Sequence, residues 1–205
     1  MSMPTPLPGG RLAPGASITP RTLTPVTGPP LELPDPDPAR LTHLQFRRFA
    51  GCPVCNLHLR SVVRRHSELT AAGVREVVLF HSPADELRAH VADLPFPVVA
   101  DPDKRLYVEF GVESAPRALL NPRVWGPLLR AVLRSAWTVP RRREHAPAAQ
   151  PHGGRLGLPA DFLIDAEGRI VAARYGEHAY DQWSVDEVLA RAGEAGALRS
   201  GTRGS

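Results

Sequence analysis

The sequence contains only two cysteines and one lysine, and it has no long run of apolar residues. A single pair, Cys52 and Cys55, cannot form the multiple-disulfide framework of a small secreted domain. No stretch approaches the ~18 consecutive apolar residues that a membrane-spanning helix needs. The N-terminal region is interrupted by Pro and Gly throughout and does not predict a secretory signal peptide. We therefore expect a cytoplasmic protein without a membrane partner, whose thiols change oxidation state.

The positive charge of the chain comes almost entirely from arginine. The formal net charge is +4, and Lys104 is the only lysine. No recognised nucleic-acid-binding motif accompanies this charge, and its one local cluster, at residues 141–143, is typical of a solvated linker. We therefore expect no nucleic-acid partner.

Length and proline distribution indicate one main domain. A chain of 205 residues can bury one good hydrophobic core. Of its 23 prolines, 11 fall within the first 38 positions. We assign residues 1–15 to a flexible Pro/Gly-rich segment, 16–192 to the domain and 193–205 to a frayed tail. Residues 121–155 break the pattern of the domain and are interpreted as an insertion that contains a helix at 121–139.

The hydrophobic pattern alternates between strands and helices. We expect short edge strands within 16–34, strands at 41–50, 74–81 and 96–100, and helices at 53–72, 82–93 and 104–110. Gly73 is expected to end the first helix, and Ser82 to cap the second. An antiparallel hairpin at 160–164 and 169–175 precedes a last helix, which starts near Ser184 with Glu187 in a capping box and ends near Ala192. This order favours a mostly parallel sheet covered by helices on both faces.

The two cysteines lie between a predicted strand and a predicted helix. The motif Cys52-Pro53-Val54-Cys55 follows Gly51, which ends the strand in a turn. A thiol pair at such a junction is typical of a thioredoxin-type redox centre. Unpaired N–H groups and the dipole at a helix N-terminus favour the thiolate, which is the nucleophilic form. The pattern therefore predicts a redox-active pair with a thiol pKa below the usual value of about 8.5.

Several segments resemble the peroxiredoxin-like branch of the alkyl hydroperoxide reductase/thiol-specific antioxidant superfamily. They are Phe46–Cys55, Asp101–Tyr107 and Gly157–Ile164, extended by Tyr175–Ala179 and Asp181–Glu187. The resemblance spans roughly residues 10–192. It implies an α/β, thioredoxin-like fold, in which a central mixed sheet is flanked by helices and an inserted helix precedes the final hairpin.

The resemblance also implies a function. The protein would be a thiol-dependent antioxidant oxidoreductase that reduces peroxides or another oxidised substrate through a reversible disulfide between Cys52 and Cys55. No cofactor is implied. The reductant would be thioredoxin or a low-molecular-weight thiol. The oligomeric state stays open, with a homodimer as one option.

Two residues after the insertion acquire roles from the same resemblance. Leu158-Pro159 aligns with the cis-proline that faces the disulfide in thioredoxin-like proteins, so we expect a cis bond and a substrate contact at Pro159. Asp161 is expected to be a buried acid that relays a proton to the resolving thiol.

The chain departs from the Pro-x-x-x-Thr-x-x-Cys motif of typical peroxiredoxins. That motif places Arg48 at the proline, Cys52 at the threonine and Cys55 at the cysteine that attacks peroxide. The downstream arginine of the family falls near Pro159 here. This chain therefore lacks the positive charge of that arginine, and Arg47, Arg48 or Arg117 can supply it instead.

The choice of attacking thiol stays open between two mechanisms. In a thioredoxin-type reaction Cys52 attacks and Cys55 resolves the mixed disulfide. In a peroxiredoxin-type reaction Cys55 forms a sulfenic acid, and Cys52 condenses with it. We favour Cys52, because we expect it to be the more exposed. Two other classes are a non-catalytic redox sensor, and a zinc site that recruits His58 with His43 or His66, whose spacing is unlike that of zinc fingers.

Overall fold

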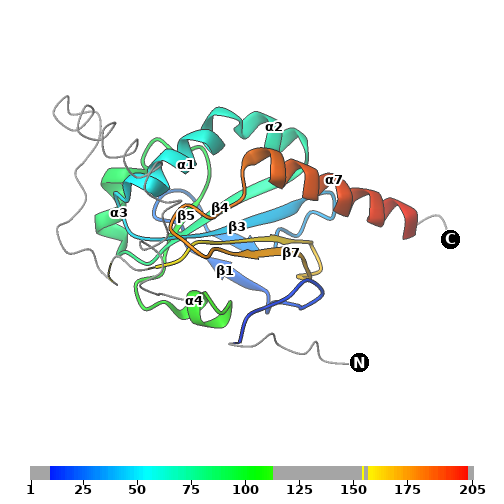
Figure 1. Ribbon diagram of the computed structural model, residues 1–205, viewed down its shortest axis with the longest axis horizontal. Coiled ribbons are helices and arrows are strands. Elements are labelled where there is room, and N and C mark those ends of the chain that lie inside the picture. Colours follow the sequence, from blue (N-terminus) through cyan, green and yellow to red (C-terminus); the bar gives the residue numbers. More distant parts are fainter. Residues whose placement is uncertain (1–9, 113–153, 155–156, 203–205) are drawn as a thin grey trace.

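The computed structural model describes residues 10–112, 154 and 157–202 (Figure 1). Its elements, in chain order, are β1 (Arg21–Leu23), β2 (Leu31–Leu33), β3 (Leu41–Arg47), α1 (Pro53–Arg64), α2 (His66–Ala71), β4 (Val74–Phe80), α3 (Ala84–Val91), β5 (Val98–Ala100), α4 (Arg105–Glu109), β6 (Ala160–Ile164), β7 (Ile170–Tyr175) and α7 (Val185–Thr202). The inserted helix expected at 121–139, like the whole segment 121–153, lies outside the described residues.

A mixed sheet of five strands forms the centre of the molecule, in the order β5-β4-β3-β6-β7. β3 pairs in parallel with β4, which pairs in parallel with β5. On its other side β3 pairs antiparallel with β6, and β6 and β7 form the expected hairpin. β1 and β2 make a separate antiparallel pair. The predicted α/β, thioredoxin-like fold is confirmed.

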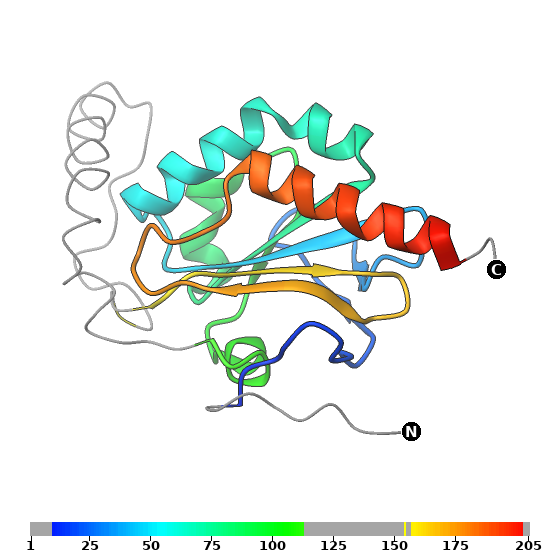
Figure 2. The same cartoon turned by 45° about the vertical axis from the view of Figure 1, so that its right-hand side comes forward.

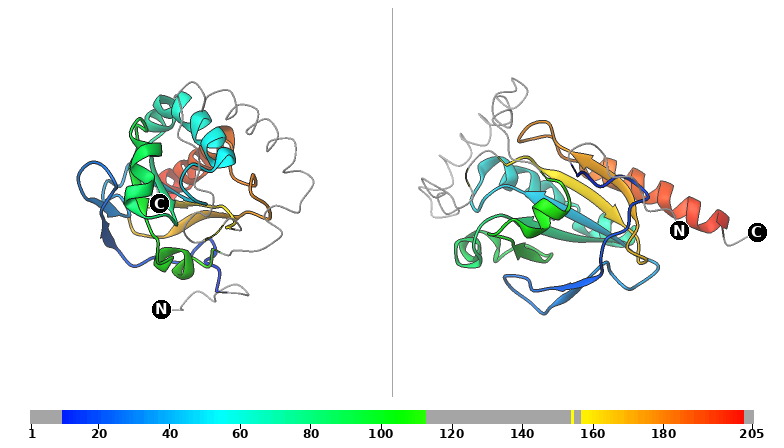
Figure 3. Two further views of the ribbon diagram at one scale, coloured as in Figure 1. Left: turned by 90° about the vertical axis from the view of Figure 1, so that its left-hand side faces the viewer. Right: turned by 90° about the horizontal axis from the view of Figure 1, so that it is seen from below.

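Helices cover both faces of the sheet (Figures 2 and 3). Buried side chains of α1, α2, α3 and α7 form one core with the first face, and that core contains both cysteines. Buried side chains of α4, β1 and β2 form a second core on the other face. In Figure 2 the cyan and red helices lie above the sheet, and the green α4 lies below it.

β3 is buried along its whole length and has one unusual face. Because successive strand residues point to opposite sides, Leu44 and Phe46 join the core that contains α4. His43, Gln45 and Arg47 point to the side of α1 and are at most 1% exposed. The sheet therefore places three polar side chains beneath the helix that begins at the thiols.

Two local expectations about helix ends are corrected, and a third is confirmed. The helix expected over 53–72 is broken at Arg65, whose φ of −117° and ψ of 18° leave the helical region. Its N–H bonds to the Val62 oxygen at 3.2 Å, which tightens the last turn of α1. Ser82 does not cap α3, which starts after Pro83; its hydroxyl accepts a hydrogen bond from the Ala50 amide instead, at 2.9 Å. Gly73 does end the helical region, with φ +72°.

The last helix and the segment after residue 9 also differ from the expectation. α7 continues to Thr202, beyond the predicted end at Ala192, because Ala, Glu, Leu and Arg surround Gly193 and Gly196 and favour helix. Within the segment expected to be flexible, residues 10–15 lie against the sheet, where the Leu12 amide donates to the Tyr175 hydroxyl at 2.7 Å.

Of the helices in the described part of the chain, none is long and apolar enough to cross a membrane.

Candidate active site

The two thiols lie at the N-terminus of α1. Gly51, with φ +70°, makes the turn that leaves β3, and Cys52 is the N-cap residue. Pro53 occupies the first helical position, where its missing N–H costs no hydrogen bond. Cys55 follows within the first turn, and both thiols are free. The strand-to-helix placement inferred from the sequence is therefore present.

Arg48 is the charged residue that contacts a thiol. Its Nη1 donates to the Cys52 sulfur at 3.8 Å. Burial opposes the ionisation of Cys52, but a hydrogen bond from the Cys55 thiol and the positive charge of Arg48 outweigh it and lower the pKa of Cys52 to about 6. Burial, the hydrogen bond to Cys52 and the negative charge of Cys52 together raise the pKa of Cys55 well above its usual value. At neutral pH the pair holds a thiolate at Cys52 and a proton on Cys55.

The expected difference in exposure between the two cysteines is wrong. Cys52 is 1% exposed and Cys55 is 2% exposed. The difference between them is electrostatic, since the Cys52 sulfur lies at the helix terminus beside Arg48. The preference for Cys52 as the nucleophile therefore depends on its ionisation to a thiolate and not on its exposure.

The segment before β6 lies against Arg48. A Cβ atom built on Gly157 would lie 3.6 Å from Cγ of Arg48 and 3.1 Å from Nε2 of His81. The His81 amide also donates to the Arg48 carbonyl at 3.2 Å. A side chain at position 157 would therefore crowd the His81 ring, while its Cβ would make only an ordinary contact with Arg48.

The expectation of a cis bond at Leu158-Pro159 is wrong. Among the described residues the one cis peptide bond joins Leu33 and Pro34, so the bond before Pro159 is trans. Trans is the more stable form of an X-Pro bond, and Pro159 leads straight into β6 without a sharp turn. Its carbonyl accepts a hydrogen bond from the Gly176 amide at 2.8 Å. A substrate contact at Pro159 remains a prediction.

The Arg47 side chain lies in a buried polar network. Its Nη2 bonds to Oδ1 of Asp161 at 2.8 Å and to Nε2 of His58 at 3.2 Å, and it also donates to Gln45. Glu76 on β4 also belongs to the network, and its carboxylate accepts hydrogen bonds from Gln45 and from Nδ1 of His43. All members of the network are at most 5% exposed, and they are His43, Gln45, Arg47, His58, Glu76 and Asp161.

Asp161 is buried, as expected, but its partners argue against a proton relay. Burial opposes its ionisation, yet the positive charges of Arg47 and of His43, whose Nε2 lies 3.4 Å from Oδ1 of Asp161, hold the pKa of the carboxyl below its usual range. A relay needs a group that takes up and releases a proton near neutral pH. Asp161 stays ionised as the counterion of Arg47, so we assign it a structural role.

The two histidines of the network carry different charges. Burial lowers the pKa of His43, but Glu76 and Asp161 more than compensate and raise it to about 9. Burial and the charge of Arg47 lower the pKa of His58 well below its usual value. At neutral pH, His43 is charged and His58 is neutral. The sequence carries two signals of this network, the polar alternation along 43–47 and the acid in the apolar strand 74–81, but no local pattern joins these residues.

We expect the stability of a variant without cysteines to fall as the pH rises from 6.5 to 9. His43 keeps its proton in the folded protein up to its pKa of about 9, whereas the usual pKa is 6.5. Its stabilising contribution is therefore fully present below pH 6.5 and lost on approaching pH 9, and it amounts to about 3 kcal/mol. Urea unfolding of the Cys52→Ser/Cys55→Ser protein across this range measures it.

The cysteines are removed in that experiment because Cys52 acts in the opposite direction. Its pKa is about 6 in the folded protein against 9.0 usually, so its contribution grows over the same range. Adding His43→Gln to the cysteine-free variant should flatten the profile. A cysteine-free protein whose stability does not change with pH would contradict a charged His43.

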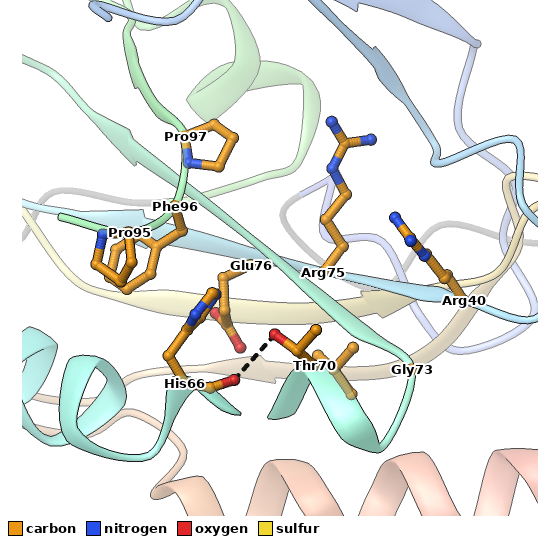
Figure 4. Close-up of a pocket in the computed structure, with 10 residues that line it drawn as sticks. Arg40, His66, Thr70, Gly73, Arg75, Glu76, Pro95, Phe96 and Pro97 are labelled. Atoms are coloured by element: carbon orange, nitrogen blue, oxygen red, sulfur yellow. Dashed lines mark hydrogen bonds between the residues drawn. The ribbon is translucent and has the colours of Figure 1, made fainter. Parts of the chain in front are cut away.

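A cavity of ≈ 190 Å³ lies at the other end of the sheet (Figure 4). It is formed by α2, the start of β4 and the segment before β5. The cavity lies beside the start of β4, whereas the thiols follow the end of β3, which runs parallel to β4. β4 alone spans about 20 Å, so the length of the sheet separates the two places. Arg75 and Arg40 border the cavity, and both pair with Asp35, at 2.9 and 3.7 Å. The cavity is therefore separate from the thiol site.

The histidines considered for a zinc site have other contacts. His58 bonds to Arg47, and His66 packs on the ring of Phe96 with centroids 5.7 Å apart. Within residues 10–112 and 157–202, no three His, Cys, Asp or Glu side chains are grouped so that they could hold a metal ion. Arg117, the other candidate for the missing charge, lies outside the described residues.

The fold agrees with a comparison against known families. The model of the AhpC/TSA antioxidant enzyme family matches residues 61–178, which is more than half of the chain. The chain belongs to this family, so its class of function is that of a thiol-dependent oxidoreductase of the peroxidase type. The matched segment begins six residues after Cys55, and the two thiols lie just before it.

Solved peroxiredoxins share the fold. Peroxidoxin BcpB from Mycobacterium tuberculosis matches with a TM-score of 0.61 and 17% identity, over 89% of this chain and 97% of that one. The Plasmodium vivax 2-Cys peroxiredoxin matches with a TM-score of 0.64 and 12% identity, over 92% and 84%. Mycobacterium tuberculosis AhpC matches with a TM-score of 0.60 and 16% identity, over 93% and 94%. No curated protein matches the sequence.

Proposed function

We propose that this protein reduces peroxides, or another oxidised substrate, through a reversible disulfide between Cys52 and Cys55, and that Cys52 attacks first. The observation that carries the proposal is the contact of Arg48 with the Cys52 sulfur at the N-terminus of α1. A buried guanidinium and a helix terminus both stabilise the anion that attacks. The neighbouring Cys55 keeps its proton until it resolves the intermediate.

With a hydroperoxide as substrate, the chemistry proceeds in two balanced steps. The Cys52 thiolate attacks one peroxide oxygen, the O–O bond breaks, and the alkoxide that leaves takes up a proton. Cys52 becomes a sulfenic acid. The Cys55 sulfur then attacks the Cys52 sulfur and displaces its oxygen, which leaves as water with the Cys55 proton. The enzyme loses two hydrogens, and the hydroperoxide becomes an alcohol and water.

Arg48 can supply the positive charge that a downstream arginine supplies in typical peroxiredoxins. Position 52, which is threonine in that motif, is itself a thiol, and Pro159 stands near the place of the downstream arginine. The Arg48 guanidinium, which is 3% exposed and beside Cys52, is positioned to stabilise negative charge at the reacting sulfur. This assigns Arg48 rather than Arg47 to the reaction.

The disulfide must be reduced again for turnover. A thiolate of thioredoxin or of a low-molecular-weight thiol attacks one sulfur of the disulfide, and a second thiol releases the reduced enzyme. This step fits a reducing compartment such as the cytoplasm. We include a homodimer in the same proposal as one option for the assembly. Thiol–disulfide exchange is the second candidate reaction, because the low-pKa cysteine is Cys52, the nucleophile position of thioredoxin-type centres.

Stopped-flow oxidation of the reduced protein tests the proposal. Hydrogen peroxide, cumene hydroperoxide and oxidised glutathione are compared, with tryptophan fluorescence for the rate and mass spectrometry for the hydrogens lost. We expect the loss of two hydrogens at a rate well above that of free cysteine. Fast reaction with glutathione disulfide alone would select exchange. Rates equal to free cysteine with all three oxidants would contradict the proposal.

A redox sensor is separated from an enzyme by turnover. With excess peroxide and a thioredoxin system present, an enzyme consumes many equivalents of reductant per protein. A sensor is oxidised once and then stops. We expect continued consumption.

A further inference from the structure

His58 connects the thiol helix to the central strand. It lies on α1 one turn after Cys55, and it is 5% exposed. Its Nε2 is 3.2 Å from Nη2 of Arg47. A guanidinium has only donors, so Nε2 must accept this hydrogen bond, and the ring must be neutral with its proton on Nδ1. The lowered pKa of His58 agrees with that state.

Arg47 is held firmly enough to serve as an anchor. Besides His58, it binds the Asp161 carboxylate at 2.8 Å, the Phe46 carbonyl at 3.3 Å and the Gln45 side chain. Its own carbonyl accepts a hydrogen bond from the hydroxyl of Tyr107. These partners come from β3, β6 and α4, so the backbone at the end of β3 is fixed from both faces of the sheet.

The next residue after this anchor is the one that contacts the thiolate. Arg48 reaches the Cys52 sulfur from the end of β3, while Cys52 itself begins α1. The relative position of strand and helix therefore sets the distance between the guanidinium and the sulfur. In the part of the chain that the structure describes, the bond from Arg47 to His58 joins α1 to the buried network.

We propose that His58 is a positioning residue: by accepting the Arg47 hydrogen bond it fixes α1 against the end of β3, and so keeps Arg48 beside the Cys52 sulfur. The inference rests on the proposed function, in which Cys52 is the reactive thiolate. Without the bond, α1 can move relative to β3. A shift of about 1 Å from the present separation weakens the attraction between the two charges by about a fifth.

The test compares substitutions of His58 that keep or remove the acceptor. In His58→Gln the amide oxygen reaches about as far as Nε2 and still accepts from Arg47. In His58→Leu no acceptor remains, and in His58→Asn the polar group is too short to reach. The rate of Cys52 alkylation by iodoacetamide is measured against pH, in a Cys55→Ser background so that one thiol reacts.

We expect the midpoint of this profile to rise by about one pH unit in His58→Leu and in His58→Asn. The rate at pH 6 then falls about five-fold, because the thiolate fraction drops from about a half to about a tenth. His58→Gln should keep the midpoint of the parent. At pH 9 the three rates should converge, which separates a change in ionisation from a change in access.

The outcomes distinguish the inference from the proposed function. A parent midpoint near 9 would contradict the low-pKa thiolate and the function that depends on it. A parent midpoint near 6 that does not move in His58→Leu and His58→Asn would overturn the role of His58 alone, even if both variants lose stability. An equal shift in His58→Gln would also overturn it. If His58→Leu does not fold, His58→Asn carries the comparison.

Discussion

Replacing Cys52 with serine is expected to abolish turnover with peroxide and with disulfide substrates, by a factor on the order of 10³ or more. A serine hydroxyl stays protonated at neutral pH, so Arg48 and the helix terminus have no anion to stabilise at position 52. The remaining thiol, Cys55, is still buried, and burial is the largest of the causes that raise its pKa, so it is a poor nucleophile. Steady-state consumption of reductant measures the loss.

Cys55→Ser is the matched variant, because its hydroxyl can still donate to the Cys52 sulfur. It should be oxidised once at close to the rate of the unmodified protein and then accumulate the Cys52 sulfenic acid. A sulfenic-acid probe and mass spectrometry identify the modified residue. The assignment is reversed if Cys52→Ser reacts rapidly with peroxide and Cys55→Ser does not, since Cys55 would then be the attacking thiol, as in the peroxiredoxin motif.

Asp161→Asn is expected to lower the free energy of unfolding by about 3–5 kcal/mol. Asp161 and Arg47 are both fully buried, with 2.8 Å between Oδ1 and Nη2. The amide leaves the guanidinium inside the protein without a counterion, and desolvation of an unpaired charge is costly. Urea unfolding of the reduced proteins gives the difference.

The control is Asp103→Asn. Asp103 pairs with Arg105 at 3.2 Å, but both side chains are more than half exposed. Solvent-exposed pairs contribute at most about 1 kcal/mol, so this change should hardly affect unfolding. A loss below about 1 kcal/mol in Asp161→Asn would mean that other acceptors around Arg47 replace the carboxylate.

Local patterns in the sequence were enough to predict most of the strands and helices, whereas the thioredoxin-like arrangement was implied by the family resemblance. The alternation of β-branched runs and amphipathic segments predicted the strands and most helices, because each depends on neighbouring residues. The ends were less predictable. Arg65 leaves the helical region, and Ser82 binds the Ala50 amide rather than capping α3. A contact with a distant residue decided the use of the Ser82 hydroxyl, and no local pattern contains that information.

The sequence alone placed Cys52 and Cys55 at the start of a helix, and it identified Arg47, Arg48 and Asp161 as the charged groups to consider. Only the tertiary structure divided these charges between two sites. Arg47 and Asp161 are 114 positions apart, and they meet because β3 and β6 are neighbours in the sheet. Arg48, one residue further, lies past the end of the strand and reaches Cys52. A sequence pattern shows which residues share a strand face, but the pairing of strands decides which charges meet, and burial decides what each charge does.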